Sequence, residues 1–299
     1  EAVDIAGFCR RYPDLEAELR TELEAITEID RMVEFAGEPG RLPDRLSGHK
    51  ILGELGAGGM GRVFLALDEG LGRKVAIKTL SERYRENPVV RARFLQEARA
   101  MARVSHPHVV RIYNLGPPGE PPHFVMEYVE GVPLTRAAQP LSLTQKVELM
   151  RQVARAVECL HQHQVIHRDL KPGNILVGAD LEPKVMDFGL ALQVDEGDRL
   201  TLAGEVMGTP RYLSPEQARG ETSLDARSDV VALGTVFYEL LTGAPPFRAD
   251  NLAGQVRAIC HEDPVVPRRL DPDLPGELQN ICLQALEKNP ADRYGSARE

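Results

Sequence analysis

The 299 residues are 42% hydrophobic and 27% charged, so the chain can bury a core and has the length of about two domains. Its formal net charge of -9 argues against a nucleic-acid-binding protein, which must neutralise phosphates. The four cysteines, Cys9, Cys159, Cys260 and Cys282, are too widely spaced for CxxC pairs. This spacing argues against a zinc knuckle or a disulfide framework and favours a reducing, cytoplasmic location.

Residues 1–47 differ from the rest in charge, with 12 acidic and 6 basic side chains. Six apolar residues recur there every three or four positions, which predicts an amphipathic helix: Leu15, Leu19, Leu23, Ile26, Ile29 and Val33. A turn-rich linker follows over residues 38–44. We expect an acidic helical extension that docks on the next domain, pairs with a second copy, or has no regulatory effect.

The chain starts without a methionine and ends where a helix could begin. We therefore interpret it as a piece of a longer protein. The most apolar stretch, residues 230–241, is shorter than the ~18 residues of a membrane span. A membrane tether is expected only if sequence outside this chain supplies one.

After the linker, residues 63–67 and 74–78 are predicted strands. The run from Gly56 to Val63 reads GAGGMGRV and matches the pattern GxGxxGxV. A dinucleotide-binding fold would place a helix after the last glycine, and a Walker loop would place Gly-Lys-Ser/Thr there, whereas this chain has Arg62 and a strand. Two alternatives remain: a flap of two strands over phosphates, or a flexible hairpin.

Lys78 ends the second strand, 17 residues after Gly61, and could contact phosphate oxygens beneath such a flap. Residues 94–101 are predicted to form a helix, with Glu97 beside its apolar face. Glu97 could hold Lys78 in place. An exposed ion pair of this kind contributes only about 0–1 kcal/mol, so its value would lie in positioning.

The most specific segment is His167-Arg168-Asp169-Leu170-Lys171-Pro172-Gly173-Asn174, followed 13 residues later by Asp187-Phe188-Gly189. Together with the glycine run, the lysine and the glutamate, it resembles the protein kinase family, and in particular bacterial Ser/Thr kinases of the eukaryotic type. The resemblance spans about Leu46 to Arg293. It implies an α+β, two-lobed fold, with a small antiparallel-sheet lobe at 48–129 and a large, mainly helical lobe at 130–299 that is truncated at its C-terminus. The apolar stretch 230–241 resembles the buried central helix of that large lobe.

The resemblance also implies that ATP and Mg²⁺ are used to phosphorylate serine or threonine hydroxyls of protein substrates. Lys78, held by Glu97, would orient the α and β phosphates, and Lys171 would meet the γ phosphate. Asn174 and Asp187 would hold two Mg²⁺ ions. The implied ATP-binding residues are Gly56, Ala57, Gly58, Gly59, Met60, Gly61, Val63, Ala76, Lys78, Met126, Glu127, Val129 and Leu176.

Asp169 would align the substrate hydroxyl and accept its proton. An ordinary aspartate pKa of about 3.9 makes it a poor base for an alcohol, so we expect late proton transfer and a larger contribution from orientation.

The segment between Gly189 and Ser214 resembles an activation loop. It ends at Ser214-Pro215-Glu216, where alanine is frequent at the first position, and Glu216 is expected to pair with Arg293. Arg168 is expected to meet an anion on the loop, with Thr201 as the first candidate for autophosphorylation and Thr209 as a substrate-platform residue.

Several other residues have structural explanations. His161, His163 and His167 suggest a metal cluster, but we disfavour it because they fit a helix end, a turn and a packed position. Met126 is either a gatekeeper beside the adenine-binding hinge or a core residue. An apolar spine is expected, anchored by Asp229 and formed by Met101, Ile112, His167 and Phe188.

Two other function classes stay open from the sequence. A nonenzymatic pseudokinase scaffold would have lost at least one of four residues that are all present here: Lys78, Asp169, Asn174 and Asp187. A small-molecule phosphotransferase would lack the long segment from Asp187 to Glu216.

Overall fold

The computed structural model describes residues 44–58, 61–187 and 210–299. The chain divides after Asp44, and Arg45–Glu299 forms one unit. The predicted leader helix and most of the linker lie outside the described residues. Across the described ranges, no helix is long and apolar enough to cross a membrane.

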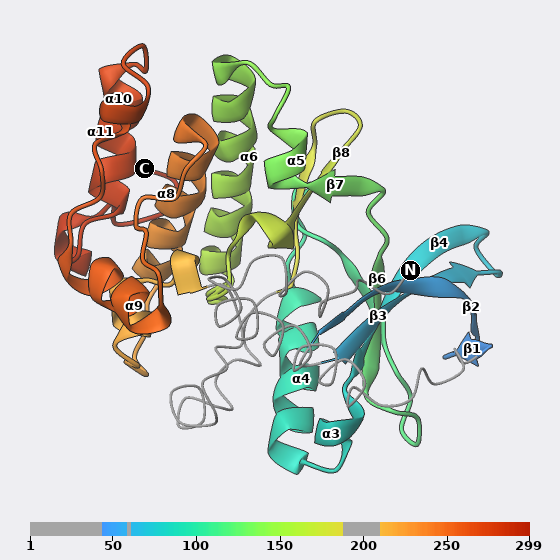
Figure 1. The fold of residues 1–299 in the computed structure, drawn as a ribbon. Helices are drawn as coiled ribbons and strands as arrows, with labels where there is room; N and C mark the ends of the chain where they lie inside the picture. Colours follow the sequence, from blue (N-terminus) through green and yellow to red (C-terminus); the bar gives the residue numbers. More distant parts are fainter. Residues whose placement is uncertain (1–43, 59–60, 188–209) are drawn as a thin grey trace, which may run out of the picture. The chain divides into compact units, whose positions relative to one another are not determined.

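A six-stranded antiparallel sheet forms the first part of this unit (Figure 1). The strands lie in the order β1-β2-β3-β4-β6-β5. The predicted strands at 63–67 and 74–78 are confirmed as parts of β3 and β4, and the β1–β2 pairing starts the sheet before residue 48. The strands are β1 Arg45–Leu46, β2 His49–Gly58, β3 Gly61–Asp68, β4 Arg73–Leu80, β5 Ile112–Leu115 and β6 His123–Glu127.

Successive residues of β4 are buried on opposite faces of the sheet, because side chains alternate along a strand. Val75 and Ile77 pack in a small cluster with Ala66 and Val125. Ala76, between them, belongs to the main core. Both faces of the strand are therefore covered, which explains its continuous apolar run and fixes the direction of Lys78.

Helix α4 (Pro88–Met101) contributes to that main core and carries Glu97. It starts at Asn87, whose side-chain oxygen accepts hydrogen bonds from the backbone N–H groups of Val89 and Val90 at 3.0 and 3.2 Å. Phe94, Ala98 and Met101 are buried at helical spacing, as predicted for residues 94–101. A short helix, α3 (Glu82–Arg85), precedes it.

The second part of the unit is mainly helical (Figure 1). Helix α8 lies at its centre, and the buried helix predicted over the apolar stretch 230–241 is confirmed. Gly234 of α8 permits close packing on α11, because a Cβ there would lie 2.6 Å from the Cβ of Ala285. The helices are α5 Leu134–Ala137, α6 Leu143–Gln162, α7 Pro215–Ala218, α8 Arg227–Thr242, α9 Leu252–His261, α10 Pro267–Leu270 and α11 Gly276–Ala285.

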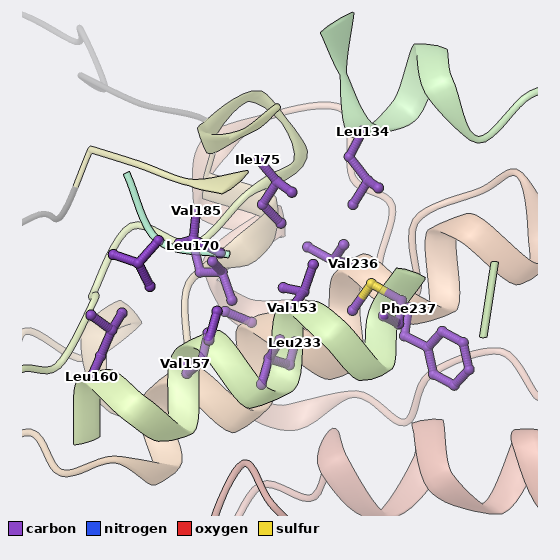
Figure 2. Close-up of a cluster of buried hydrophobic side chains, with 14 of the residues drawn as sticks. Leu134, Val153, Val157, Leu160, Leu170, Ile175, Val185, Leu233, Val236 and Phe237 are labelled. Atoms are coloured by element: carbon purple, nitrogen blue, oxygen red, sulfur yellow. The ribbon is translucent and has the colours of Figure 1, made fainter. Parts of the chain in front are cut away.

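The core of this helical part is formed chiefly by α6 and α8, as Figure 2 shows for Val153, Val157, Leu233 and Val236. Leu170 and Ile175 enter the same core and are 1% and 0% exposed. Fully burying such side chains contributes roughly 1.5–3 kcal/mol each. These two anchors therefore fix both ends of the polar turn 171–174.

A second, three-stranded antiparallel sheet follows the first, with strands β7 (Gly131–Pro133), β8 (Ile175–Gly178) and β9 (Pro183–Val185). The backbone of Val185 exchanges hydrogen bonds with Val110 and His108 at 3.0 and 2.9 Å, which ties β9 to the segment before β5. Within the described part of this unit there are also three short 3₁₀ helices: η2 Pro172–Asn174, η4 Pro210–Tyr212 and η5 Pro290–Asp292.

Candidate active site

The described glycines of the glycine-rich run lie where β2 ends and β3 begins, and Gly58 pairs there with Gly61. A Cβ at Gly61 would lie 1.8 Å from the carbonyl oxygen of Thr79, so packing against β4 requires glycine there. At Gly56 and Gly58, by contrast, a Cβ would meet nothing within 4 Å. Packing within the protein therefore explains why residue 61 is glycine, but it does not explain the glycines at 56 and 58.

The other predicted pocket residues lie on both sheets and on the segment that joins them. Ala76 of β4 is paired with Met126 of β6, and Val63 of β3 with Lys78. Met126 is 2% exposed, as a core residue would be. Leu176 is half-buried between two buried neighbours on β8, so it points to the opposite face of that strand. Val129 is half-buried in the segment that leaves β6.

Glu127, at the end of β6, joins the two sheets. Its carboxylate lies 2.7 Å from the ammonium of Lys184 on β9, and it accepts a hydrogen bond from the backbone N–H of Arg111 at 3.2 Å. Both charged side chains are largely buried, at 25% and 19% exposed. The segment predicted to meet adenine is therefore held by an ion pair between strands of different sheets.

Lys78 donates a hydrogen bond to Asp187 Oδ1 at 2.8 Å, across 109 positions of sequence. Burial lowers the pKa of Lys78, but the carboxylates of Asp187 and Glu97 outweigh it and raise the pKa above its ordinary value. Burial likewise raises the pKa of Asp187, and the Lys78 ammonium outweighs this effect and lowers it. Both groups are therefore charged near neutral pH. Glu97 is 3% exposed and acts on Lys78 through its charge.

Asp169, Lys171 and Asn174 form a second cluster beside this pair. Lys171 Nζ donates to Asp169 Oδ2 at 2.8 Å, and Asn174 Nδ2 donates to the same oxygen at 3.0 Å. Asn174 Nδ2 also reaches the backbone oxygens of Asp169 and Asp187, at 2.7 and 3.5 Å. Asn174 therefore links Asp187 to the segment 167–174, which we call the catalytic loop because it carries the predicted catalytic residue Asp169.

The loop that carries Asp169 is held in place by hydrogen bonds to Asp229 of α8. The Asp229 carboxylate accepts hydrogen bonds from the backbone N–H groups of His167 and Arg168 at 2.7 and 2.9 Å, and His161 Nε2 lies 2.8 Å from it. Asp229 is 1% exposed, and the predicted anchor is confirmed. Arg168 and Asp187 have left-handed backbones, with φ of 67° and 56°. Such conformations cost energy in residues other than glycine and persist where the surroundings fix them.

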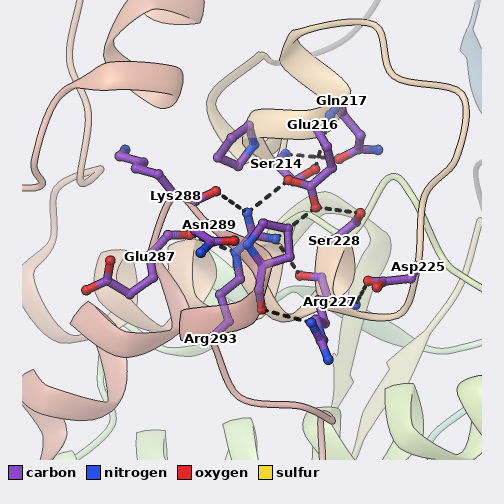
Figure 3. A network of polar contacts seen from close by, with 12 residues as sticks. Ser214, Glu216, Gln217, Asp225, Arg227, Ser228, Glu287, Lys288, Asn289 and Arg293 are labelled. Carbon is purple, nitrogen blue, oxygen red and sulfur yellow. Dashed lines mark hydrogen bonds and ion pairs between the residues drawn. The ribbon is translucent and has the colours of Figure 1, made fainter.

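Helix α7 is anchored through its residue Glu216, which pairs with Arg293 (Figure 3). Their two hydrogen bonds, at 2.8 and 2.9 Å, confirm the predicted pair. Ser228 donates a further bond to Glu216 Oε1 at 2.8 Å. Arg293 also donates hydrogen bonds to the backbone oxygens of Arg227 and Lys288. These contacts fix α7 to α8 and to the segment near Arg293.

Two acidic groups, an amide and two ammonium groups thus meet where β4 of the six-stranded sheet contacts Asp187 and the loop that carries Asp169. This set of groups is suited to binding a polyphosphate and its metal ions. The protein kinase domain model matches residues 49–299. The chain belongs to the protein kinase domain family.

Curated kinases resemble the chain closely in sequence. Serine/threonine-protein kinase PknB of Mycolicibacterium smegmatis is 44% identical over 266 residues, covering 86% of this chain and 42% of that protein. A probable serine/threonine-protein kinase of Streptomyces coelicolor is 40% identical over 266 residues, covering 86% and 39%. The chain thus spans about two fifths of the length of these relatives.

Solved kinase structures share the fold. The Mycobacterium tuberculosis PknI kinase domain has a TM-score of 0.65 at 27% identity, covering 85% of this chain and 94% of that one. A Rad53 structure in complex with AMP-PNP has a TM-score of 0.68 at 25% identity, covering 83% and 62%. The predicted two-lobed α+β fold of a protein kinase is therefore confirmed.

The histidines considered for a metal cluster in this kinase domain have other contacts. His161 Nε2 lies 2.8 Å from Asp229, and His163 Nδ1 lies 2.8 Å from the backbone oxygen of Cys159. His167 is fully buried, and its Nε2 lies 3.1 Å from the backbone oxygen of Met186. Burial lowers the pKa of His167 more than the nearby carboxylates raise it, so its ring is neutral at pH 7.

Some predicted residues lie outside the described ranges, namely Gly59, Met60, Phe188, Thr201 and Thr209. Besides the Lys78–Asp187 bond, two contacts of the kinase site were not predicted from the sequence. One is the Glu127–Lys184 pair, for which the sequence carries no signal. The other is made by Gln217, whose spacing from Ser214 matches the capping-box pattern and could have been noticed.

Proposed function

We propose that this domain is a serine/threonine protein kinase, which transfers the γ phosphate of ATP to hydroxyls of protein substrates. The observation that supports this most is the contact between the two polar clusters: Lys78 bonds to Asp187, and Asn174 bonds to both Asp169 and Asp187. Phosphoryl transfer depends chiefly on positioning and electrostatics, so residues fixed in this way fit the reaction. The curated relatives carry the same activity in their names.

ATP would lie beneath the β2–β3 hairpin. Lys78 would hold the α and β phosphates, and Ala76, Val63, Met126 and Leu176 would enclose the base. The backbone of Glu127 and Val129 would meet the adenine edge. The open space beside Gly56 and Gly58 supports close approach of the backbone amides at the end of β2 to phosphate oxygens.

Mg²⁺ fits the donor set at Asp187 and Asn174, because this ion prefers carboxylate and carbonyl oxygens. The lowered pKa of Asp187 keeps its carboxylate ionised, and the amide of Asn174 is oriented by the bonds of its Nδ2 to Asp169 and Asp187. Bound there, Mg²⁺ would neutralise the negative charge of the phosphates.

Asp169 would orient the attacking hydroxyl and accept its proton late in the reaction. One of its carboxylate oxygens is held by Lys171 and Asn174, which fixes the direction of the carboxylate. Lys171 would move from this bond towards the γ phosphate. Specificity for serine and threonine is proposed from Lys171 and Thr209.

The decisive experiment measures transfer of ³²P from γ-labelled ATP to the protein itself and to serine- and threonine-containing peptides. Asp169→Asn should remove the transfer, and Asp180→Asn, at an exposed turn outside both clusters, should leave it intact. ATP binding without transfer would indicate a scaffold. Transfer to small alcohols but not to peptides would indicate a small-molecule phosphotransferase.

We further propose that residues 1–44 form an extension outside the kinase lobes that docks on the small lobe or mediates self-association; Arg45 and Leu46, counted with the extension from the sequence, belong to the sheet as β1. The support is their acidic charge and apolar stripe. Deleting residues 1–44 should change the activity, the melting temperature or the mass in solution. If all three stay unchanged, the extension has no such role.

A further inference from the structure

The side chain of Gln217 bridges helix α7 and the peptide bond that precedes Asp169. Its Oε1 accepts a hydrogen bond from the backbone N–H of Ser214 at 3.0 Å, and its Nε2 donates to the backbone oxygen of Arg168 at 2.7 Å. Its own backbone N–H donates to Ser214 Oγ at 3.3 Å. Gln217 therefore caps the helix with one end of its amide and contacts the catalytic loop with the other.

The Arg168 peptide unit needs such support. Its φ of 67° is a conformation that costs about 1–3 kcal/mol in most residues and persists only where the surroundings fix it. Asp229 accepts the Arg168 N–H at 2.9 Å, and Gln217 donates to the Arg168 carbonyl. The backbone leading into Asp169 is thus held from α8 on one side and from α7 on the other.

We propose that Gln217 is a positioning residue for Asp169. By fixing the Arg168 carbonyl it sets the plane of the 168–169 peptide bond, and with it the direction in which Asp169 presents its carboxylate. Because α7 also carries Glu216, the same side chain couples the end of the segment 187–216 to the catalytic loop. The inference rests on the proposed function, in which Asp169 orients the substrate hydroxyl.

The alternative is that Gln217 only caps α7. The two roles can be separated because its side-chain oxygen contacts Ser214 and its side-chain nitrogen contacts Arg168. Gln217→Glu keeps an oxygen that can accept the Ser214 N–H but removes the donor to Arg168. Gln217→Met keeps the length and removes both bonds. Ser214→Ala removes only the hydroxyl that caps the Gln217 N–H and leaves the Gln217 side chain unchanged.

The three variants are compared by steady-state kinetics with a peptide substrate, with the melting temperature measured in parallel. A 1 Å misplacement of a catalytic group costs about a hundredfold in rate, so both Gln217 variants should lose about 10- to 100-fold in kcat. Their KM for ATP should stay near that of the wild type, and Ser214→Ala should retain its kcat. Wild-type kcat in Gln217→Glu would overturn the proposal. So would a loss of kcat that follows the melting temperature across all three variants.

Hydrogen–deuterium exchange supplies a test that does not require activity. Peptides covering residues 166–174 should exchange faster in Gln217→Glu than in the wild type, while those of α7, whose cap is retained, should exchange at the wild-type rate. Unchanged exchange in the catalytic loop would overturn the positioning role. If the wild-type protein transfers no phosphate, the proposed function fails, and the exchange result still decides whether Gln217 holds the loop.

Discussion

Arg293 donates hydrogen bonds to both carboxylate oxygens of Glu216, from Nη1 to Oε1 at 2.8 Å and from Nη2 to Oε2 at 2.9 Å, across 77 positions of sequence. The side chains are 0% and 6% exposed. Burial raises the pKa of Glu216, but the bonds from Arg293 and Ser228 outweigh it and lower the pKa from 4.5 to about 2. The pair therefore stays charged inside the fold.

Removing this carboxylate should be strongly destabilising. Glu216→Ala leaves a buried guanidinium without its counter-charge, which costs about 3–5 kcal/mol. Glu221→Ala, which removes an exposed partner of Arg219, should cost no more than about 1 kcal/mol. Urea unfolding of both variants and the wild type at pH 7 measures the difference.

The same pair predicts a pH dependence. The folded pKa of Glu216 is depressed, so its stabilising contribution is present above the ordinary value of 4.5 and disappears as the pH falls towards about 2. The difference in unfolding free energy between wild type and Glu216→Ala should shrink between pH 5 and pH 3. A difference that is constant over this range would contradict the assigned charge state.

Substituting alanine for either of two glycines of the β2–β3 hairpin should have different effects on stability. Gly61→Ala places a Cβ within 1.8 Å of the Thr79 carbonyl oxygen, so β3 and β4 must separate and the melting temperature should fall. Gly58→Ala meets nothing within 4 Å and should leave stability unchanged, while raising the KM for ATP if the hairpin backbone approaches phosphate. Equal melting temperatures for the two variants would refute the packing explanation for Gly61.

The sequence points to the candidate catalytic groups because their motifs are short and contiguous, as in the run from His167 to Asn174. It also predicted β3, β4, α4 and α8, whose apolar patterns match their burial. It did not predict the Glu127–Lys184 pair, which depends on how two sheets meet. The Lys78–Asp187 bond was likewise missed, because the sequence gives the charges and not the distance between lobes.

Thr201 should carry phosphate in active protein. Mass spectrometry of wild-type protein incubated with ATP should find phosphate on Thr201, and Asp169→Asn protein should lack it. Thr201→Ala should lower peptide phosphorylation, because the phosphate charge would no longer neutralise Arg168. Thr222→Ala, at an exposed position, serves as the control. A Thr201 that stays unmodified in fully active protein would remove this prediction.

Asp229 should be intolerant even of the isosteric change Asp229→Asn. Its carboxylate receives three donors, the backbone N–H groups of His167 and Arg168 and the Nε2 of His161. An asparagine offers one oxygen and one NH₂ group, so in either orientation the NH₂ faces a buried N–H donor. Each buried donor left unsatisfied costs about 1–3 kcal/mol.

Asp229→Asn should therefore lower the unfolding free energy by at least about 1 kcal/mol and reduce kcat, because the same bonds hold the backbone in front of Asp169. Asp250→Asn removes a charge at an exposed position and should leave both quantities near the wild-type values. If the two variants unfold at the same urea concentration, the carboxylate of Asp229 is not needed to hold the loop. The anchoring would then have to come from the buried side chains of Leu170 and Ile175.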